Sequence, residues 1–155
     1  MGTTSIVEIC TTIKEWMDEL ADTVIANGFH QVQNYDEISE GINDPPTCQV
    51  YWQDLTYDTL GNTTAYAIGK TRRARQLTFH IDAFCQRRNN IDENMGNTHR
   101  FADLIWNKLE EKDVCNAFGQ LQIQLVGPVE VRRVVFDYAT VLYPGVQVIL
   151  TVEVI

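Results

Sequence analysis

The chain has 155 residues, of which 45% are apolar and 21% are charged, and its formal net charge is −9. This length and composition predict one soluble globular domain, residues 1–155, with enough apolar side chains for a substantial core. The acidic balance argues against free nucleic acid as a partner, and no apolar run approaches the roughly 20 residues that a membrane-spanning helix needs.

The first third of the chain predicts a long helix followed by a strand. From Ile6 onward, apolar residues recur at steps of three and four, which is typical of an amphipathic helix, and Gly28 is well placed to end it. We therefore expect a helix over residues 4–27. A polar loop with a short strand near Val32 follows, and "CQVYWQD" (48–54) reads as the next strand.

The central segment predicts a hairpin that leads into the clearest strand of the chain. Residues 54–76 contain a turn at Gly61-Asn62 and a second break at Gly69, so we expect a long protruding hairpin or loop. "QLTFHIDAF" (76–84) alternates between apolar and polar residues, with His80 and its polar neighbours on one side. Such alternation predicts a strand with one face on the core and the other face elsewhere.

The last part of the chain predicts a second helix and then strands. The helix is expected over about 92–112, and the strands are expected within 120–126, 129–138 and 146–154, with a turn at Pro144-Gly145. Alternating glutamines in residues 120–126 either face solvent or line a channel. The order of elements predicts an α+β fold: a mostly antiparallel sheet, two main helices packed on one face, and a long protruding hairpin loop.

No catalytic, cofactor-binding or metal site is predicted. "GKT" at 69–71 ends like a phosphate-binding loop, but Thr64 stands where the first glycine is needed, and a strand follows instead of a helix. The three histidines and four cysteines are scattered, without the spacing of metal ligands, and neither serine lies in a nucleophile elbow. We therefore expect no cofactor and no enzyme, with a small α+β enzyme or ligand-binding module as the alternative from another class.

Half of the positive charge lies in one short segment. Residues 70–88 hold six bases and one acid, whereas residues 1–69 hold 11 acids and one base. Clustered bases repel one another unless acids lie nearby, which favours an interface over the alternative of a solvated strand end. The predicted interface residues are Lys70, Arg72, Arg73, Arg75, Tyr57, Tyr66 and Ile68, and the predicted acidic partner face on a neighbouring copy is Glu15, Asp18, Glu19 and Asp22. A contact between two different patches closes a ring when the rotation fits.

Several segments together resemble a known family. The element order, the long loop before "LTFHIDAF", the helix "NTHRFADLIWNKLEE" and the ending "YPGVQVILTVEV" resemble the tail terminator (tail completion) proteins of long-tailed bacteriophages. The resemblance is one of pattern, extends over nearly the whole chain and carries over no catalytic residue. It implies a hexameric ring that sits on the finished tail tube, stops its polymerisation and offers a docking surface to the neck of the filled capsid. The long acidic first segment and the long 54–76 loop depart from the family pattern.

The resemblance also implies partners and a location. The partners would be further copies of this chain, the tail tube protein and a neck or head-closure protein, with DNA only passing through the channel and no membrane involved. The basic residues would then contact a subunit or the tube. The protein would belong to the tail or neck of the virion after assembly in the host cytoplasm. A head-closure or other neck protein is the close alternative, because both kinds of protein form rings on the same axis.

Overall fold

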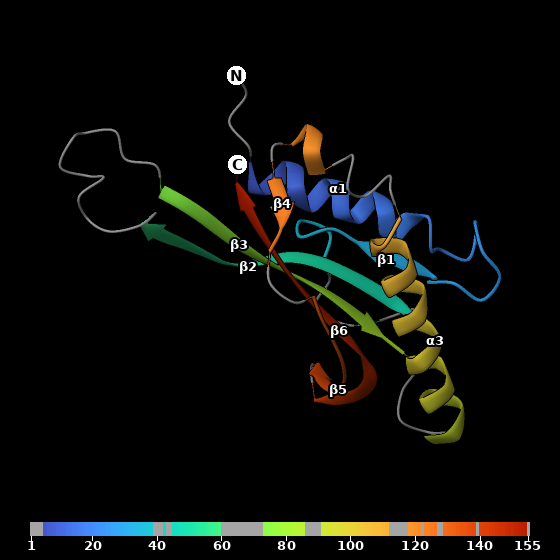
Figure 1. Ribbon diagram of the computed structural model, residues 1–155. Helices are drawn as coiled ribbons and strands as arrows, with labels where there is room; N and C mark the ends of the chain where they lie inside the picture. The colour runs from blue at the N-terminus through green and yellow to red at the C-terminus, as the bar shows by residue number, and fades with distance from the viewer. Residues whose placement is uncertain are drawn as a thin grey trace, which may run out of the picture.

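The computed structural model describes residues 5–38, 42, 45–59, 73–85, 91–111, 118–121, 123–126, 129–138 and 140–154. These residues form an α+β fold with a curled, mostly antiparallel sheet and three helices (Figure 1). The predicted α+β class is therefore confirmed, whereas two helices on one face and a protruding hairpin stay predictions. None of the described helices has the length and apolar character needed to cross a membrane.

Two long helices and one short helix lie in the described residues. The long helices are α1 (Ile6–Asp18) and α3 (Ile91–Leu109), and the short helix covers residues 118–120. Ser5 caps the start of α1, because its side chain accepts a hydrogen bond from the Glu8 N–H at 3.0 Å. The helix expected over about 92–112 is confirmed as α3, which begins one residue earlier and ends three residues earlier.

The first helix is shorter than the sequence predicts. It ends at Asp18, so the prediction of a helix over residues 4–27 is wrong beyond that point. The chain then turns back, and the Phe29 N–H donates to the Leu20 carbonyl at 3.0 Å. A Cβ on Gly28 would lie 2.2 Å from the same carbonyl, so a glycine is needed for this close approach. The periodic pattern continues past the helix because Leu20 is buried in the turn as well.

The sheet contains six strands. They are β1 (Gln31–Gln33), β2 (Thr47–Thr59), β3 (Arg73–Phe84), β4 (Ile123–Leu125), β5 (Glu130–Tyr138) and β6 (Val141–Val154). Their order is β1-β2-β3-β6-β4, and β5 pairs with β6 as well. Strand β1 is the predicted short strand near Val32, and it is parallel to β2. All other pairs of strands are antiparallel. Because β3 occupies one edge of β6, strands β4 and β5 share the other edge.

The pairing of β2 with β3 extends into the segment 54–76, for which a long protruding hairpin or loop is expected. The register pairs Tyr57 with Arg75 and Thr59 with Arg73, so both ends of this segment are strands. Strands form in this polar sequence because ladder hydrogen bonds come from the backbone and do not require apolar side chains. Residues 60–72, the expected hairpin tip, lie outside the described residues.

The predicted turn at Pro144-Gly145 is wrong, because β6 runs straight through both residues. The chain instead reverses before Val141, next to Thr140, which has a φ of 67°. A Cβ on Gly145 would lie 2.2 Å from the Ala83 carbonyl oxygen and 2.6 Å from the Phe136 ring. This glycine therefore serves the close packing of neighbouring strands, and it does not make a turn.

The predicted strand over residues 120–126 is wrong at its start. Gln120 lies in the short helix at 118–120, and β4 contains only Ile123–Leu125. Gln120 and Gln124 therefore do not belong to one strand, and Gln122 lies outside the described residues. A row of three glutamines along a channel is not formed.

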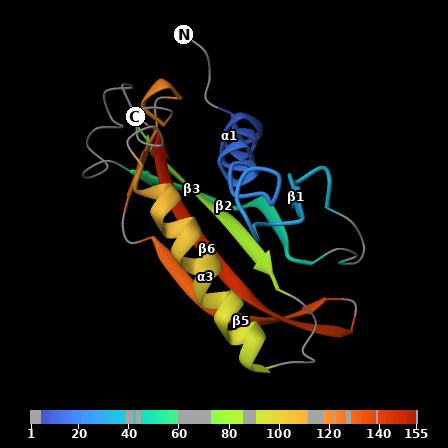
Figure 2. The ribbon, with the colours of Figure 1, turned by 90° about the vertical axis from the view of Figure 1, so that its right-hand side faces the viewer.

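One face of the sheet, which we call the core face, carries the main core. On β3 and β6 its buried residues are Leu77, Phe79, Ile81, Ala83, Val146, Val148, Leu150 and Val152. Side chains of both long helices belong to the same cluster, and Phe29 stacks on Phe101 of α3 with ring centroids 4.5 Å apart. Strands β1 and β2 contact α1, and β5 and β6 contact α3 (Figure 2). The alternation predicted for residues 76–84 is confirmed.

Candidate functional site

The predicted basic interface maps to the end of the β2–β3 pair. Arg73 and Arg75 lie in the first three residues of β3, and Tyr57 lies opposite Arg75 in β2. Pairing of β3 with β6 begins only at Gln76, so the two arginines belong to a part of the sheet where β3 has β2 as its strand partner. For these three residues the backbone is described. Lys70, Arg72, Tyr66 and Ile68 lie outside the described residues.

The predicted acidic partner face is split by the end of α1. Glu15 and Asp18 lie in the helix, Glu19 follows it directly, and Asp22 lies in the turn that leads back to Phe29. The four acids therefore do not share one helical face, as a helix over residues 4–27 would have required. Glu15, Glu19 and Asp22 are exposed, and Asp18 is half-buried.

Two of these acids lie close to bases of the same chain. The Lys14 Nζ atom lies 2.8 Å from Asp18 Oδ2, and the His30 Nε2 atom lies 4.0 Å from Asp22 Oδ2. The hydrogen bond to Asp18 is the main cause that raises the pKa of Lys14. The ion pair between Lys14 and Asp18 contributes little stability, but it offsets one of the negative charges of this face.

Glu19 connects the ends of the two long helices. Its carboxylate pairs with the Lys108 ammonium group of α3, and that group also lies 2.9 Å from Glu111 Oε2. Burial lowers the pKa of Lys108, but the hydrogen bonds and charges of Glu19 and Glu111 outweigh burial and raise it. The Lys108 side chain is 10% exposed, whereas those of Glu19 and Glu111 are 58% and 49% exposed, so the two ion pairs lie at the surface of the protein. The charge of Glu19 is thus partly neutralised within its own chain.

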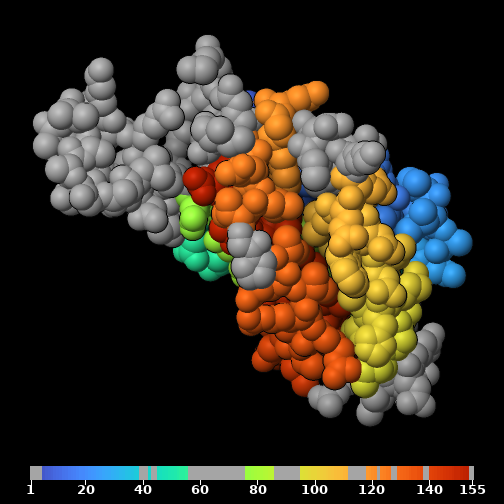
Figure 3. Space-filling view, viewed as in Figure 1, coloured from blue at the N-terminus to red at the C-terminus, as the bar shows by residue number. Residues whose placement is uncertain are grey.

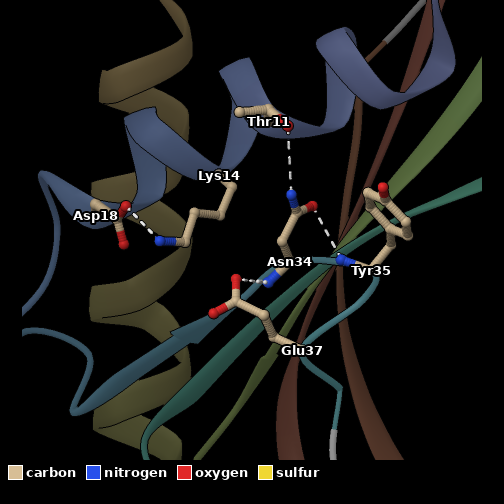
Figure 4. A network of polar contacts seen from close by, with 6 residues as sticks. All are labelled: Thr11, Lys14, Asp18, Asn34, Tyr35 and Glu37. Carbon is tan, nitrogen blue, oxygen red and sulfur yellow. Dashed lines mark hydrogen bonds and ion pairs between the residues drawn. The ribbon is translucent and has the colours of Figure 1, made fainter.

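A turn after β1 docks on the polar side of α1, near Lys14 and Asp18 (Figure 4). The Asn34 side chain donates to the Thr11 hydroxyl at 3.5 Å, and it accepts from the Tyr35 N–H at 2.9 Å. The Asn34 N–H in turn donates to Glu37 Oε1 at 3.1 Å. These contacts hold the turn beside the middle of α1, where Thr11 lies.

The second face of the sheet, which we call the polar face, carries a cluster of Tyr51, His80, Asp82 and Gln147. The Tyr51 hydroxyl donates to Asp82 Oδ2 at 2.6 Å and lies 3.2 Å from His80 Nδ1. The Gln147 amide donates to Asp82 Oδ1 at 3.1 Å. Asp82 is only 5% exposed, so its carboxylate depends on these donors in place of water.

The cluster changes the ionisation of two of its members. Burial raises the pKa of Asp82, while the hydrogen bonds from Tyr51 and Gln147 and the charge of His80 lower it. Burial and the bond to Asp82 also raise the pKa of Tyr51 well above its ordinary range. The phenol therefore keeps its proton at neutral pH and can donate it to the carboxylate.

The cluster continues across the sheet as one cross-strand row. Gln33, Gln49, Asp82 and Gln147 are in register on four neighbouring strands, and the Gln49 amide donates to Gln33 Oε1 at 3.0 Å. Cross-strand neighbours share a face, so the row fixes the relative positions of these strands. The sequence predicted that His80 and Asp82 lie on the non-core face. The partners on other strands emerge only once the register is known.

The described thiols are poor nucleophiles. Burial raises the pKa of Cys10 to about 11 and that of Cys85 to about 12, and it raises the pKa of Cys48 strongly. All three are buried and free, as expected for small core residues. Within the described ranges, no group of three or more His, Cys, Asp or Glu side chains is placed to hold a metal ion.

Comparison with known proteins does not assign the chain to a family. No model of a known protein family matches the sequence, and no curated protein matches it significantly.

Proposed function

We propose that this protein is a structural component of a long-tailed bacteriophage virion: a tail terminator that forms a ring of six copies on the end of the tail tube. The proposal starts from the pattern resemblance described above. The α+β fold with a curled, mostly antiparallel sheet supports it, because the resemblance implies a fold of this class. Two helices on one face of the sheet and a hairpin that protrudes from it belong to the proposal.

The observation that carries the proposal is the register of β2 and β3. Their pairing runs on past Gln76, the last β3 residue that pairs with β6, as far as Arg73 and Thr59. The backbone of Arg73 and Arg75 thus lies at the end of a two-stranded extension of the sheet, beyond the part of β3 that pairs with β6. Such an arm supplies the reach that a subunit or tube contact needs.

The mechanism is geometric. One face of the ring matches the last ring of tube subunits, and the opposite face lacks the surface on which another tube subunit would assemble. That opposite face joins a neck or head-closure protein, and DNA passes through the channel without binding. The net charge of −9 suits this passage, because a channel lined by acidic protein does not hold the phosphate backbone. No catalytic residue and no cofactor take part.

Electron micrographs of particles assembled without the protein test this function. A terminator predicts overlong tails that are not joined to heads, because nothing stops tube growth or provides the docking surface. Filled heads that leak and carry no tails would instead identify a head-closure protein. Normal particles would contradict any role in the virion, and a bound metabolite in the purified protein would favour the small enzyme or ligand-binding module.

A further inference from the structure

Apart from the short strands β1 and β4, two longer strands on opposite sides of the sheet have an edge without a strand partner among the described residues. Strand β2 pairs with β3 along its whole length but with β1 only over residues 47–49, which leaves its outer edge without a strand partner from Val50 to Thr59 among the described residues. The Trp52 indole N–H donates to the Asp54 carbonyl on this stretch. Strand β5 pairs with β6 alone, so its outer edge is open over all nine residues. An open edge presents unpaired N–H and C=O groups, and it is a template for another strand.

We infer that two copies of this chain join edge to edge, with β5 of one copy pairing with β2 of the next. This inference rests on the proposed ring and names its subunit contact. A bulge between Trp52 and Asp54 interrupts the β2 ladder, so the seam uses the regular part from Asp54 to Thr59. Each of the two edges thus binds a strand from another copy of the same chain.

The strand directions fit this pairing. Strands β2, β3, β6 and β5 alternate in direction, because each pair of neighbours is antiparallel. The two open edges therefore run in opposite directions, and copies related by rotation about an axis along the strands meet in an antiparallel pair. The core face of one copy continues into the core face of the next, as a closed ring of subunits requires.

The exposed side chains beside the two edges are complementary. On the core face, β2 offers Leu55 and β5 offers Val131 and Val135, which are 37%, 37% and 55% exposed. On the polar face, β2 offers the exposed Asp54 and β5 offers Arg132, whose side chain is 59% exposed. The seam thus buries apolar area on one face and pairs opposite charges on the other.

Strand β5 is accessible beside α3 (Figure 3). Arg132 lies 3.0 Å from Glu130 of its own strand, an exposed pair that contributes little and can be exchanged for a contact with Asp54. Charged residues on an edge often prevent pairing, but here opposite charges stand on the two edges that would meet. Pairing of β5 with another β5 would instead bring arginines together.

Sedimentation of single-edge variants tests the seam. Leu55→Lys blocks the β2 edge, and Val135→Lys blocks the β5 edge. A matched control, Val24→Lys, makes the same kind of change at a side chain that is 63% exposed and far from both edges in sequence. Far-UV circular dichroism and the unfolding midpoint establish that each variant is folded. Asp54→Lys is a second block of the β2 edge that removes no apolar group.

The seam predicts a specific pattern of masses. Wild type and the Val24→Lys control assemble as concentration rises, whereas each blocked variant sediments as a single chain of 17.7 kDa. An equimolar mixture of the two blocked variants forms dimers and nothing larger, because one intact β2 edge meets one intact β5 edge.

Other patterns overturn the seam. If only one of the two blocks prevents assembly, the contact joins two copies of the same edge. If neither does, or if wild type stays a single chain at every concentration, no such seam exists. These results leave the particle micrographs as an independent test of the proposed function.

Discussion

The Tyr51 hydroxyl donates a hydrogen bond to the Asp82 carboxylate across the β2–β3 pair at 2.6 Å, and Asp82 is 5% exposed. The two residues are not directly opposite each other, because Tyr51 is in register with His80 and Asp82 with Gln49. The bond is therefore diagonal and connects neighbouring pairs of the ladder. Donors from two different strands offset part of the cost of burying this carboxylate, whose pKa nevertheless stays raised by burial.

Removal of the phenolic hydroxyl should destabilise the fold. Tyr51→Phe leaves the buried Asp82 with one donor fewer, so we expect the free energy of unfolding to fall by about 1–3 kcal/mol. Urea unfolding measures this change. Tyr35→Phe is the matched control, because Tyr35 is 41% exposed, and its hydroxyl should contribute less than about 0.5 kcal/mol. An equal loss of unfolding free energy in both variants would show that the hydrogen bond from Tyr51 to Asp82 does not stabilise the fold.

The raised pKa of Asp82 gives stability a defined pH dependence. The folded protein holds this proton more tightly than the unfolded chain, whose pKa is the ordinary 3.8. The contribution of Asp82 to the free energy of unfolding is complete below pH 3.8, and it is lost as the pH rises through the pKa of Asp82 in the folded protein. The free energy of unfolding of wild type minus that of Asp82→Asn should therefore fall across this window and then level off. A difference that rises with pH would mean that the pKa of Asp82 is lowered on folding.

Two glycine substitutions should have opposite effects. Gly145→Ala forces a Cβ against the Ala83 carbonyl and the Phe136 ring, so we expect a loss of about 1–3 kcal/mol in thermal or urea unfolding. Gly96 lies in α3, and nothing stands within 4 Å of an added Cβ, so Gly96→Ala should gain about 0.5–1 kcal/mol. A stable Gly145→Ala protein would show that the strands can separate there without cost.

Charge reversal in the basic segment should weaken assembly. Changing Arg72, Arg73 and Arg75 together to Glu replaces the proposed attraction to a neighbouring acidic surface or the tube with repulsion. Sedimentation should then show loss of the ring or of tube capping. The control is the same triple change to Lys, which keeps the charge and should keep assembly. If the reversal leaves ring formation and tail length unchanged, the segment is not an interface.

Much of the fold was predictable where local pattern and tertiary structure agree. The alternation of residues 76–84 predicted β3 because one face of that strand lies on the core, and the stripe in α3 predicted the second helix because Phe101 and Ile105 face the same core. The end of α1 was not predictable from periodicity. Leu20 keeps the helical spacing but is buried by a chain reversal that brings Phe29 onto Phe101.

The candidate sites also differ in how far the sequence alone predicts them. The excess of bases in residues 70–88 is visible in the sequence, since charge needs no fold to be counted. The polar cluster is not visible, because Tyr51 and Gln147 lie 31 and 65 residues from Asp82 and meet it only through the strand register. Glu19 was assigned to an intermolecular face, and only the fold brings it to Lys108.

A cryo-electron microscopy map of the protein on the end of a tail tube would test the proposed function most directly. A tail terminator should form a ring of six copies on the last tube ring, with the side chains of Arg72, Arg73 and Arg75 in contact with a neighbouring copy or the tube. A map in which those three side chains project into solvent, with no other molecule beside them, would contradict the proposed function.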